Sequence, residues 1–224
     1  MKKIKYPDSE MMVMDLANTL AAELNAILST KERVTFVVPG GTTPGPVFDI
    51  LSGVPIEWNR VNVMLSDERW VPENHERSNT RLLRERLLVD QAAAAVLIPL
   101  YQDADTPEDA LPDLSKAIGP LLPVDVLLLG MGKDMHTASL FPGADKLADA
   151  FDDHAPLLLP MRAKGADEPR VTLTAPVLHG AMTTHIVFTG KAKNKALKTA
   201  RKLNDPMKAP ISAFLKGATV HWAP

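Results

Sequence analysis

The sequence predicts an α/β protein with a single doubly wound, mostly parallel sheet and helices on both faces, an arrangement of the Rossmann-like type. Two observations lead to this prediction. Several short segments are almost entirely apolar and rich in β-branched residues, which is typical of strands buried on both faces. Segments with helical periodicity alternate with these strands along the chain, as in βαβ units.

The first predicted helix covers residues 9–30. Asp8 or Ser9 can cap its start. Apolar residues recur within it at helical spacing, namely Met12, Leu16, Leu20 and Leu24. Further helices are predicted at about 46–52, at 78–88 with Ser78 as the cap, after Thr106, at 191–203 and, as a short turn, at 211–215.

The helix that follows Thr106 contains a difficulty. Pro107 suits the first helical position and Asp109 the third, as in a capping box. Pro112 lies inside the same segment, so either the first turn ends there or the helix is kinked.

The predicted strands cover residues 33–38, 61–65, 124–129, 170–174, 185–189 and 218–222. The strand at 61–65 is followed by the charged segment "SDERW" (66–70). The composition adds no repeat and no low-complexity linker, so residues 1–224 are expected to form one domain.

Composition also limits the classes of function. The formal net charge is −2, which gives no general attraction to nucleic acid or to an anionic membrane. The absence of cysteine excludes disulfides, thiolate metal sites and a cysteine nucleophile. We expect no apolar stretch long enough to span a bilayer, and a cytoplasmic location is the default.

Four polar or glycine-rich loops follow predicted strands. They are "PGGTTPG" (39–45), "SDERWVP" (66–72), "GMGKDMHTASLFPG" (130–143) and "GKAK" (190–193). In open α/β sheets, ligands bind outside the carboxyl ends of the strands. The four loops are therefore expected to share one edge of the sheet and to form a site.

Two of these loops allow an ordinary interpretation as well. The first loop is either a common glycine turn or an anion-binding site at a helix N-terminus, formed by Gly40, Gly41, Thr42 and Thr43. The second loop, with Asp67 and Arg69, is either a solvated, salt-bridged loop or a place where Arg69 binds a carboxylate, hydroxyl or phosphate.

His136 is the strongest single candidate for catalysis, because an imidazole can take a proton near neutral pH and Asp134 could orient it. A structural histidine bonded to the backbone is the alternative. Ser139 is too close in sequence to suggest a nucleophile–base pair, and no GxSxG motif is present, so water is the favoured nucleophile. The histidines show no metal-ligand spacing, and no metal is assigned.

Arg170 begins a predicted strand, and Lys191, Lys193 and Lys195 begin the helix after Gly190. The helix macrodipole does not favour cations at a helix start. An anionic ligand would relieve this conflict, whereas the alternative is a solvated basic helix face.

Taken together, the loops resemble those of the 6-phosphogluconolactonases of the sugar-isomerase-like α/β type. The resemblance runs from about residue 8 to residue 222 and includes "PGGTTP", "SDERWVPENHERSN", "GMGKDMHTASLFPG", "RVTLT", "GKAK" and "PISAFL" in the same order. The related glucosamine-6-phosphate deaminases usually carry DEY and an HIAFNEP-like segment where this sequence has DER and HTASLFP. The resemblance implies the glucosamine-6-phosphate deaminase/ribose-phosphate isomerase-like version of the fold.

The resemblance implies hydrolysis of 6-phospho-D-glucono-1,5-lactone to 6-phosphogluconate in the oxidative pentose phosphate pathway, with no cofactor. His136 would be the base that activates water, and Asp134 would help to hold its imidazole. Arg69 would bind the substrate or stabilise charge near the carbonyl, and Asp67 would organise its loop. The phosphate would be seated by Gly40, Gly41, Thr42, Thr43, Arg170 and Lys193.

Lys193 is preferred over Lys191 because it occupies the family's G-x-x-K position after Gly190. The expected partner is a small-molecule phosphosugar lactone, with no nucleic acid and no membrane, and the expected state is a monomer or a weak homodimer.

Met135 departs from the family pattern, which has glycine between the aspartate and the histidine. If this position requires a positive φ, methionine would be strained there by about 1–3 kcal/mol. Two other functions stay open. One is a deaminase or aldose–ketose isomerase acting on an amino-sugar phosphate, with Asp67 as the enolisation base. The other is a phosphosugar-sensing regulatory module without catalysis.

Overall fold

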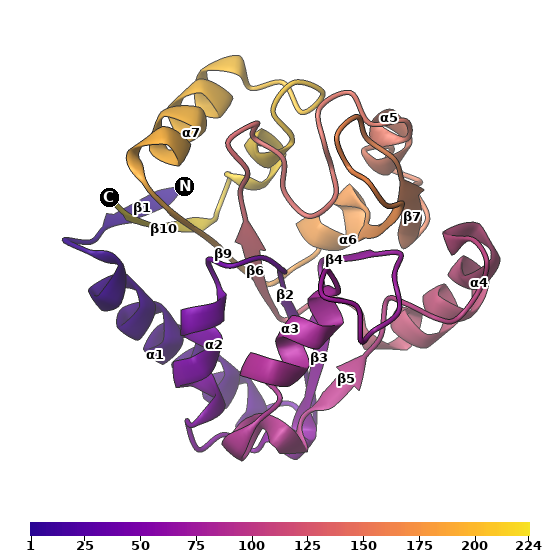
Figure 1. Cartoon of the computed structure of the whole chain (residues 1–224). Coiled ribbons are helices and arrows are strands. Elements are labelled where there is room, and N and C mark those ends of the chain that lie inside the picture. Colours follow the sequence, from indigo (N-terminus) through magenta and orange to yellow (C-terminus); the bar gives the residue numbers. More distant parts are fainter.

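The computed structural model describes all 224 residues and contains a seven-stranded sheet in the order β1-β10-β9-β6-β2-β3-β5 (Figure 1). Every neighbouring pair of strands in it is parallel. The strands are β1 (Lys2–Lys5), β2 (Val34–Val38), β3 (Val61–Leu65), β5 (Val96–Ile98), β6 (Val126–Gly130), β9 (Thr183–Thr189) and β10 (Thr219–Ala223). The predicted doubly wound, mostly parallel sheet is confirmed.

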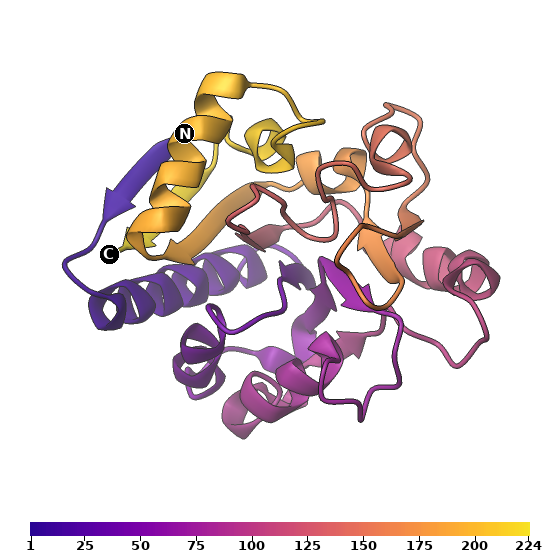
Figure 2. The same ribbon diagram turned by 45° about the horizontal axis from the view of Figure 1, so that its top comes forward.

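Helices cover both faces of this sheet (Figure 2). They are α1 (Ser9–Leu28), α2 (Gly45–Ser52), α3 (Asn79–Arg86), α4 (Pro107–Ile118), α5 (Leu147–Ala150), α6 (Ala175–His179) and α7 (Lys191–Leu203). Short 3₁₀ helices lie at Trp58–Arg60, Asp90–Ala94, Gly119–Leu121 and Pro210–Phe214. α2 packs against both α1 and α3 on one face, and α7 lies on the other. The direction of winding reverses between β2 and β6, which are neighbours near the middle of the sheet.

A second sheet of three antiparallel strands is present. It consists of β4 (Asp67–Arg69), β8 (Arg170–Leu173) and β7 (Leu158–Met161), in the order β4-β8-β7. The prediction that residues 170–174 belong to the same sheet as the other strands is wrong. Ser66 separates β3 from β4, and its carbonyl accepts a hydrogen bond from the Leu173 amide at 3.0 Å. The charged residues Asp67–Arg69 thus pair with β8 instead of extending β3 in the parallel sheet.

The predicted caps are present at three helix starts. The Asp8 side chain accepts a hydrogen bond from the Met11 amide, and the Ser78 side chain accepts one from the Arg81 amide. Thr106 and Asp109 form a capping box at the start of α4. This helix continues through Pro112 to Ile118, so the proline does not end it.

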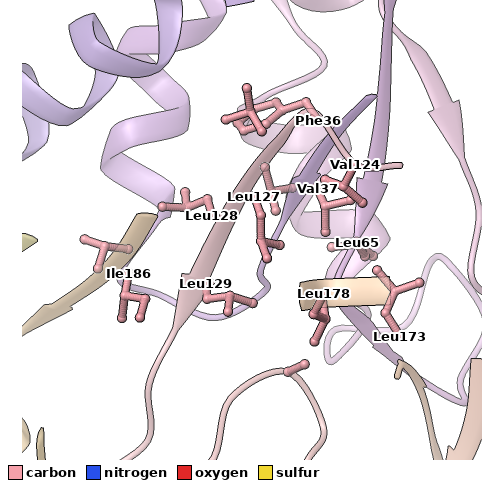
Figure 3. Close-up of a cluster of buried hydrophobic side chains, with 14 of the residues drawn as sticks. Phe36, Val37, Leu65, Val124, Leu127, Leu128, Leu129, Leu173, Leu178 and Ile186 are labelled. Carbon is pink, nitrogen blue, oxygen red and sulfur yellow. The ribbon is translucent and has the colours of Figure 1, made fainter. Parts of the chain in front are cut away.

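The core forms one cluster of 61 buried apolar residues that extends from Tyr6 to Ala223. Its centre combines strand residues such as Phe36 and Leu127 with side chains from outside the parallel sheet, such as Leu173 and Leu178 (Figure 3). Because β2, β3 and β6 are covered on both faces of the sheet, their side chains are apolar in almost every position.

α1 corrects one expectation from the sequence. By length and composition alone it could cross a membrane, although we expected no stretch of that length. Within the fold, its apolar side faces the core and contacts α2 and β10. The buried residues of this helix are Met12, Val13, Leu16, Ala17, Leu20, Ala21, Leu24 and Leu28.

A chain of hydrogen-bonded side chains joins α1 to the edge of the sheet formed by β1, β10 and β9. Tyr6 Oη lies 2.5 Å from Asp15 Oδ2 and 2.9 Å from His221 Nδ1. His221 Nε2 lies 3.0 Å from His185 Nδ1, and His185 Nε2 lies 3.0 Å from Glu23 Oε2. Burial, followed by the charge of His185, lowers the pKa of His221 from 6.5 to about 4.

This shift predicts a loss of stability in acid. Between about pH 6.5 and pH 4 the unfolded chain binds a proton at His221 and the folded chain does not, so the free energy of unfolding falls as the pH falls. The expected contribution is up to about 3 kcal/mol. Urea unfolding of the wild type and of His221→Asn at several pH values would measure it.

Because carboxylates also titrate in this range, the difference between the two proteins is the decisive quantity. We expect the stability advantage of the wild type over His221→Asn to shrink from pH 7 to pH 4. An advantage that stays constant over this range would contradict the assignment of a neutral, buried His221.

Candidate active site

A polar cavity of about 240 Å³ lies at the carboxyl ends of β2 and β6, where the direction of winding reverses. This is the place at which open α/β sheets hold their ligands. Nine of the ten predicted site residues line the cavity, namely Gly40, Gly41, Thr42, Thr43, Asp67, Arg69, His136, Arg170 and Lys193. The tenth, Asp134, contacts His136 from outside the lining.

The imidazole of His136 is oriented by Asp134. His136 Nδ1 lies 2.5 Å from Asp134 Oδ1, and the same oxygen accepts a hydrogen bond from the His136 amide at 3.3 Å. Burial would raise the pKa of Asp134, but its hydrogen bond and charge interaction with His136 outweigh burial and hold the pKa below its usual value. Since an ionised carboxylate can only accept, Nδ1 carries a proton, and Nε2 of a neutral His136 is left as a proton acceptor.

Gly132 allows the loop around His136 to close tightly. Its amide donates to the His136 carbonyl at 3.0 Å, and a Cβ at this position would lie 2.2 Å from His136 Nδ1 and 2.3 Å from Asp134 Oδ1. Any side chain at Gly132 would therefore displace the His136–Asp134 pair.

Met135 has a φ of 70°, in the left-handed region that favours glycine. The positive φ that would strain a methionine at this position is thus present. The Met135 side chain packs against the apolar core, and its carbonyl accepts a hydrogen bond from the Ile211 amide at 3.1 Å. These contacts hold Met135 in a backbone conformation that costs a residue other than glycine about 1–2 kcal/mol.

Two arginines meet on one side of the cavity. Arg69 and Arg170 are directly opposite each other in the antiparallel pairing of β4 with β8. The Nε atom of each is buried and has no hydrogen-bond partner. Burial lowers the pKa of Arg170, the charge of Asp67 opposes this change, and the charge of Arg69 adds to it. Two neighbouring cations with unused donors make this side of the cavity suited to an anionic or strongly polar ligand.

Another cation enters the cavity from α7. Burial and the charge of Lys133 lower the pKa of Lys193, while Asp134 opposes them. The start of α7 has no side-chain cap, and its third residue, Lys193, lines the cavity, so the first amide groups of this helix can serve a ligand. The start of α2 is also uncapped, but its second residue, Pro46, has no N–H to offer. Gly41, in the loop before α2, has a φ of 87° that a larger residue would adopt only with strain.

Two residues of the site had no role in the sequence analysis. Asn79 lines the cavity and donates from Nδ2 to the Asp67 carbonyl at 2.9 Å. Its side chain packs on Gly40 so closely that a Cβ there would lie 2.0 Å from Asn79 Oδ1. Glu68 is fully buried and accepts hydrogen bonds from the amides of Arg69, Asn79 and Thr80. The only sequence signal for Asn79 was its place after the capping residue Ser78 at a helix start. This signal indicated a helix cap and gave no indication that Asn79 contacts the loop of Gly40.

The sequence of the chain matches the family described as "Glucosamine-6-phosphate isomerases/6-phosphogluconolactonase" over residues 7–222. The chain belongs to this family. A 6-phosphogluconolactonase of Rhizobium meliloti (strain 1021) is 40% identical to it over 215 residues, an alignment that covers 93% of both proteins.

Two solved structures have the same fold as this chain. A 6-phosphogluconolactonase from Shewanella baltica OS155 superposes with a TM-score of 0.96 at 29% identity, covering 100% of this chain and 97% of that one. A monomeric glucosamine-6-phosphate deaminase superposes with a TM-score of 0.78 at 16% identity, covering 100% and 97%, which shows the fold alone. The resemblance inferred from the loop motifs is confirmed at the level of the family.

The angle at Met135 predicts an unusual order of stabilities for two variants. Met135→Gly and Met135→Ala both lose the packing of the side chain beyond Cβ, but only glycine relieves the positive φ. After allowance for the greater freedom of glycine in the unfolded chain, Met135→Gly should be the more stable by about 1 kcal/mol. Chemical denaturation of both variants would test this, and an alanine variant of equal or greater stability would contradict it.

Proposed function

We propose that this protein hydrolyses 6-phospho-D-glucono-1,5-lactone to 6-phosphogluconate in the oxidative pentose phosphate pathway. The observation that carries the proposal is a histidine with a free Nε2, fixed by Asp134, in a cavity that also contains Arg69, Arg170 and Lys193. Family membership and the lactonase relatives support the same reaction.

In the proposed mechanism, His136 Nε2 removes a proton from a water molecule as that water attacks the lactone carbonyl. The resulting imidazolium remains paired with the Asp134 carboxylate through Nδ1. When the ring ester bond breaks, His136 returns the proton to the leaving ring oxygen. No covalent intermediate with the protein is required, because a lactone carbonyl is already electrophilic.

Arg69 is proposed to stabilise the negative charge that develops on the carbonyl oxygen or to bind the substrate beside it. Arg69 donates from one terminal nitrogen to the Arg77 carbonyl at 2.5 Å, which fixes the direction of the guanidinium. Asp67 is proposed to organise this region and not to act as a base. Its two carboxylate oxygens already accept hydrogen bonds from Ser66 and Ser139.

The phosphate is proposed to bind between the loop Gly40–Thr43 and the two cations Arg170 and Lys193. The uncapped start of α7 adds backbone donors at this place. A phosphate would also offset the loss of hydration that burial imposes on these cations. We further propose that residues 1–224 act as one domain, as a cytoplasmic monomer or weak homodimer that acts on a small-molecule lactone.

The reaction and its base can be tested together. Freshly generated 6-phosphogluconolactone should be consumed far faster than its spontaneous hydrolysis, and His136→Asn should lose about 100-fold or more in kcat. Binding of phosphosugar should stay nearly unchanged, because His136 is not part of the proposed phosphate seat. Near-normal turnover by His136→Asn would exclude it as the base.

The same preparation should release no ammonia from glucosamine-6-phosphate. Ammonia release without lactone hydrolysis would favour the deaminase alternative instead, and phosphosugar binding without either reaction would favour a regulatory module.

The proposed phosphate-binding site predicts a kinetic effect different from that of the base, because it concerns KM more than kcat. Arg170→Ala and Lys193→Ala should raise KM about 10-fold or more with a smaller change in kcat, because contacts to the phosphate are similar in the ground and transition states. Lys195→Ala, on the same helix but outside the cavity lining, is the matched control and should leave KM unchanged. A change confined to kcat would contradict the assignment.

A further inference from the structure

Ser139 is a conspicuous residue of the histidine loop that the proposed reaction does not use. It lies three residues after His136, has no exposed surface and is not part of the cavity lining. Its Oγ donates a hydrogen bond of 2.5 Å to Oδ2 of Asp67, a residue 72 positions earlier in the chain. This bond connects the loop that carries the proposed base to the strand that carries Arg69.

A second contact strengthens the same connection. The Ser139 amide donates to Thr172 Oγ1 at 3.3 Å, and Thr172 is the partner of Asp67 in the pairing of β4 with β8. All three residues are buried. Ser139 is therefore bonded to both β4 and β8. Arg69 lies two residues after Asp67 on β4, and Arg170 lies two residues before Thr172 on β8, so both arginines share a face of the second sheet with the residues that Ser139 contacts.

The opposite part of the loop is held separately. Thr137 Oγ1 donates to the Gly130 carbonyl at 2.8 Å, and the Met135 carbonyl accepts from Ile211. These bonds join the loop to β6 and to the 3₁₀ helix Pro210–Phe214, not to the second sheet. Two connections therefore join His136 to the two arginines. One is made by the bonds of Ser139, and the other by the ring of Phe141, whose centroid lies 4.4 Å from that of His136 and 5.6 Å from Arg170 Cζ. Only the first of them is made of directional hydrogen bonds, so it is the one that can set an angle.

We propose that Ser139 is a positioning residue, which fixes the distance and angle between His136 and the Arg69–Arg170 pair through Asp67 and Thr172. The proposal rests on the proposed lactone hydrolysis. In that reaction the base and the charge-stabilising group act on the same carbonyl, so a displacement of about 1 Å between them can lower the rate by about 100-fold.

The geometry distinguishes this role from that of a nucleophile. The Ser139 hydroxyl is directed to a buried carboxylate and lies outside the cavity, so no substrate carbonyl can reach it without movement of the loop. Asp67 also accepts from Ser66 Oγ at 3.0 Å. This second serine donates to the same carboxylate, but it neighbours Asp67 in the chain and connects nothing distant.

Ser66 therefore provides the matched control. Ser139→Ala and Ser66→Ala each remove one hydroxyl donor from Asp67, but only Ser139→Ala removes a connection to the histidine loop. We expect kcat to fall about 10- to 100-fold in Ser139→Ala and by no more than about 3-fold in Ser66→Ala, with KM affected less than kcat in both. The pH at which kcat declines in acid should stay the same in Ser139→Ala, because His136 remains the base.

Hydrogen exchange gives a readout that does not depend on turnover. Amides of residues 131–138 should exchange about 10-fold faster or more in Ser139→Ala than in the wild type or in Ser66→Ala. Equal effects of the two substitutions, in exchange and in kcat, would overturn the proposal, because they would assign the effect to the Asp67 charge alone. A serine ester that accumulates during turnover of the wild type would overturn it as well.

These outcomes separate the inference from the proposed reaction. A wild type without lactonase activity would contradict the proposed function, and the exchange rates would still decide whether Ser139 holds the loop. An active wild type with an unchanged Ser139→Ala would contradict the positioning role and leave the reaction standing.

Discussion

At the carboxyl edge of the sheet, the loops after β2 and β6 turn toward opposite faces, because the chain winds in opposite directions on either side of this pair. Neither loop can fill the space between them. The cavity is a consequence of this strand order, and the other parts of the site are arranged around it. The glycine loop borders it from β2, the histidine loop borders it from β6, and the second sheet closes one side with the two arginines.

The site concentrates positive charge in a protein whose formal net charge is −2. Arg69, Arg170 and Lys193 line one small cavity, and burial makes the charged forms of Arg170 and Lys193 less favourable than in water. Asp67 and Asp134 offset only part of this charge. An anionic ligand would supply the remaining compensation, so the free energy needed to assemble the empty site is recovered when the ligand binds.

The sequence predicted which residues lie around one cavity, because these residues follow buried strands. His136, Arg69 and Lys193 each come shortly after an apolar segment, and parallel strands bring such loops to one edge. The second sheet was not predicted, because β4 and β8 are only three and four residues long and their pairing depends on contacts across 100 residues of chain. β1 reads as a run of lysines and gives no apolar signal.

Asn79 and Ser139 show a second limit of the sequence. Each is polar, small and near a recognisable motif, but the contact that matters joins it to a distant segment. The assignment of Met135 had a different basis. The family pattern identified the position, and only the backbone could show that its φ is positive.

The order in which the strands are synthesised differs from their order in space. β1 lies at the edge of the sheet, and its only partner there is β10, whose residues are more than 200 positions later. On the ribosome, β1 must therefore remain without its partner until β10 has emerged. Pairing two strands that are far apart in the sequence costs more loop-closure entropy than pairing neighbouring strands, so such pairs tend to form late in folding. β1 is therefore among the last strands of the sheet to find its place.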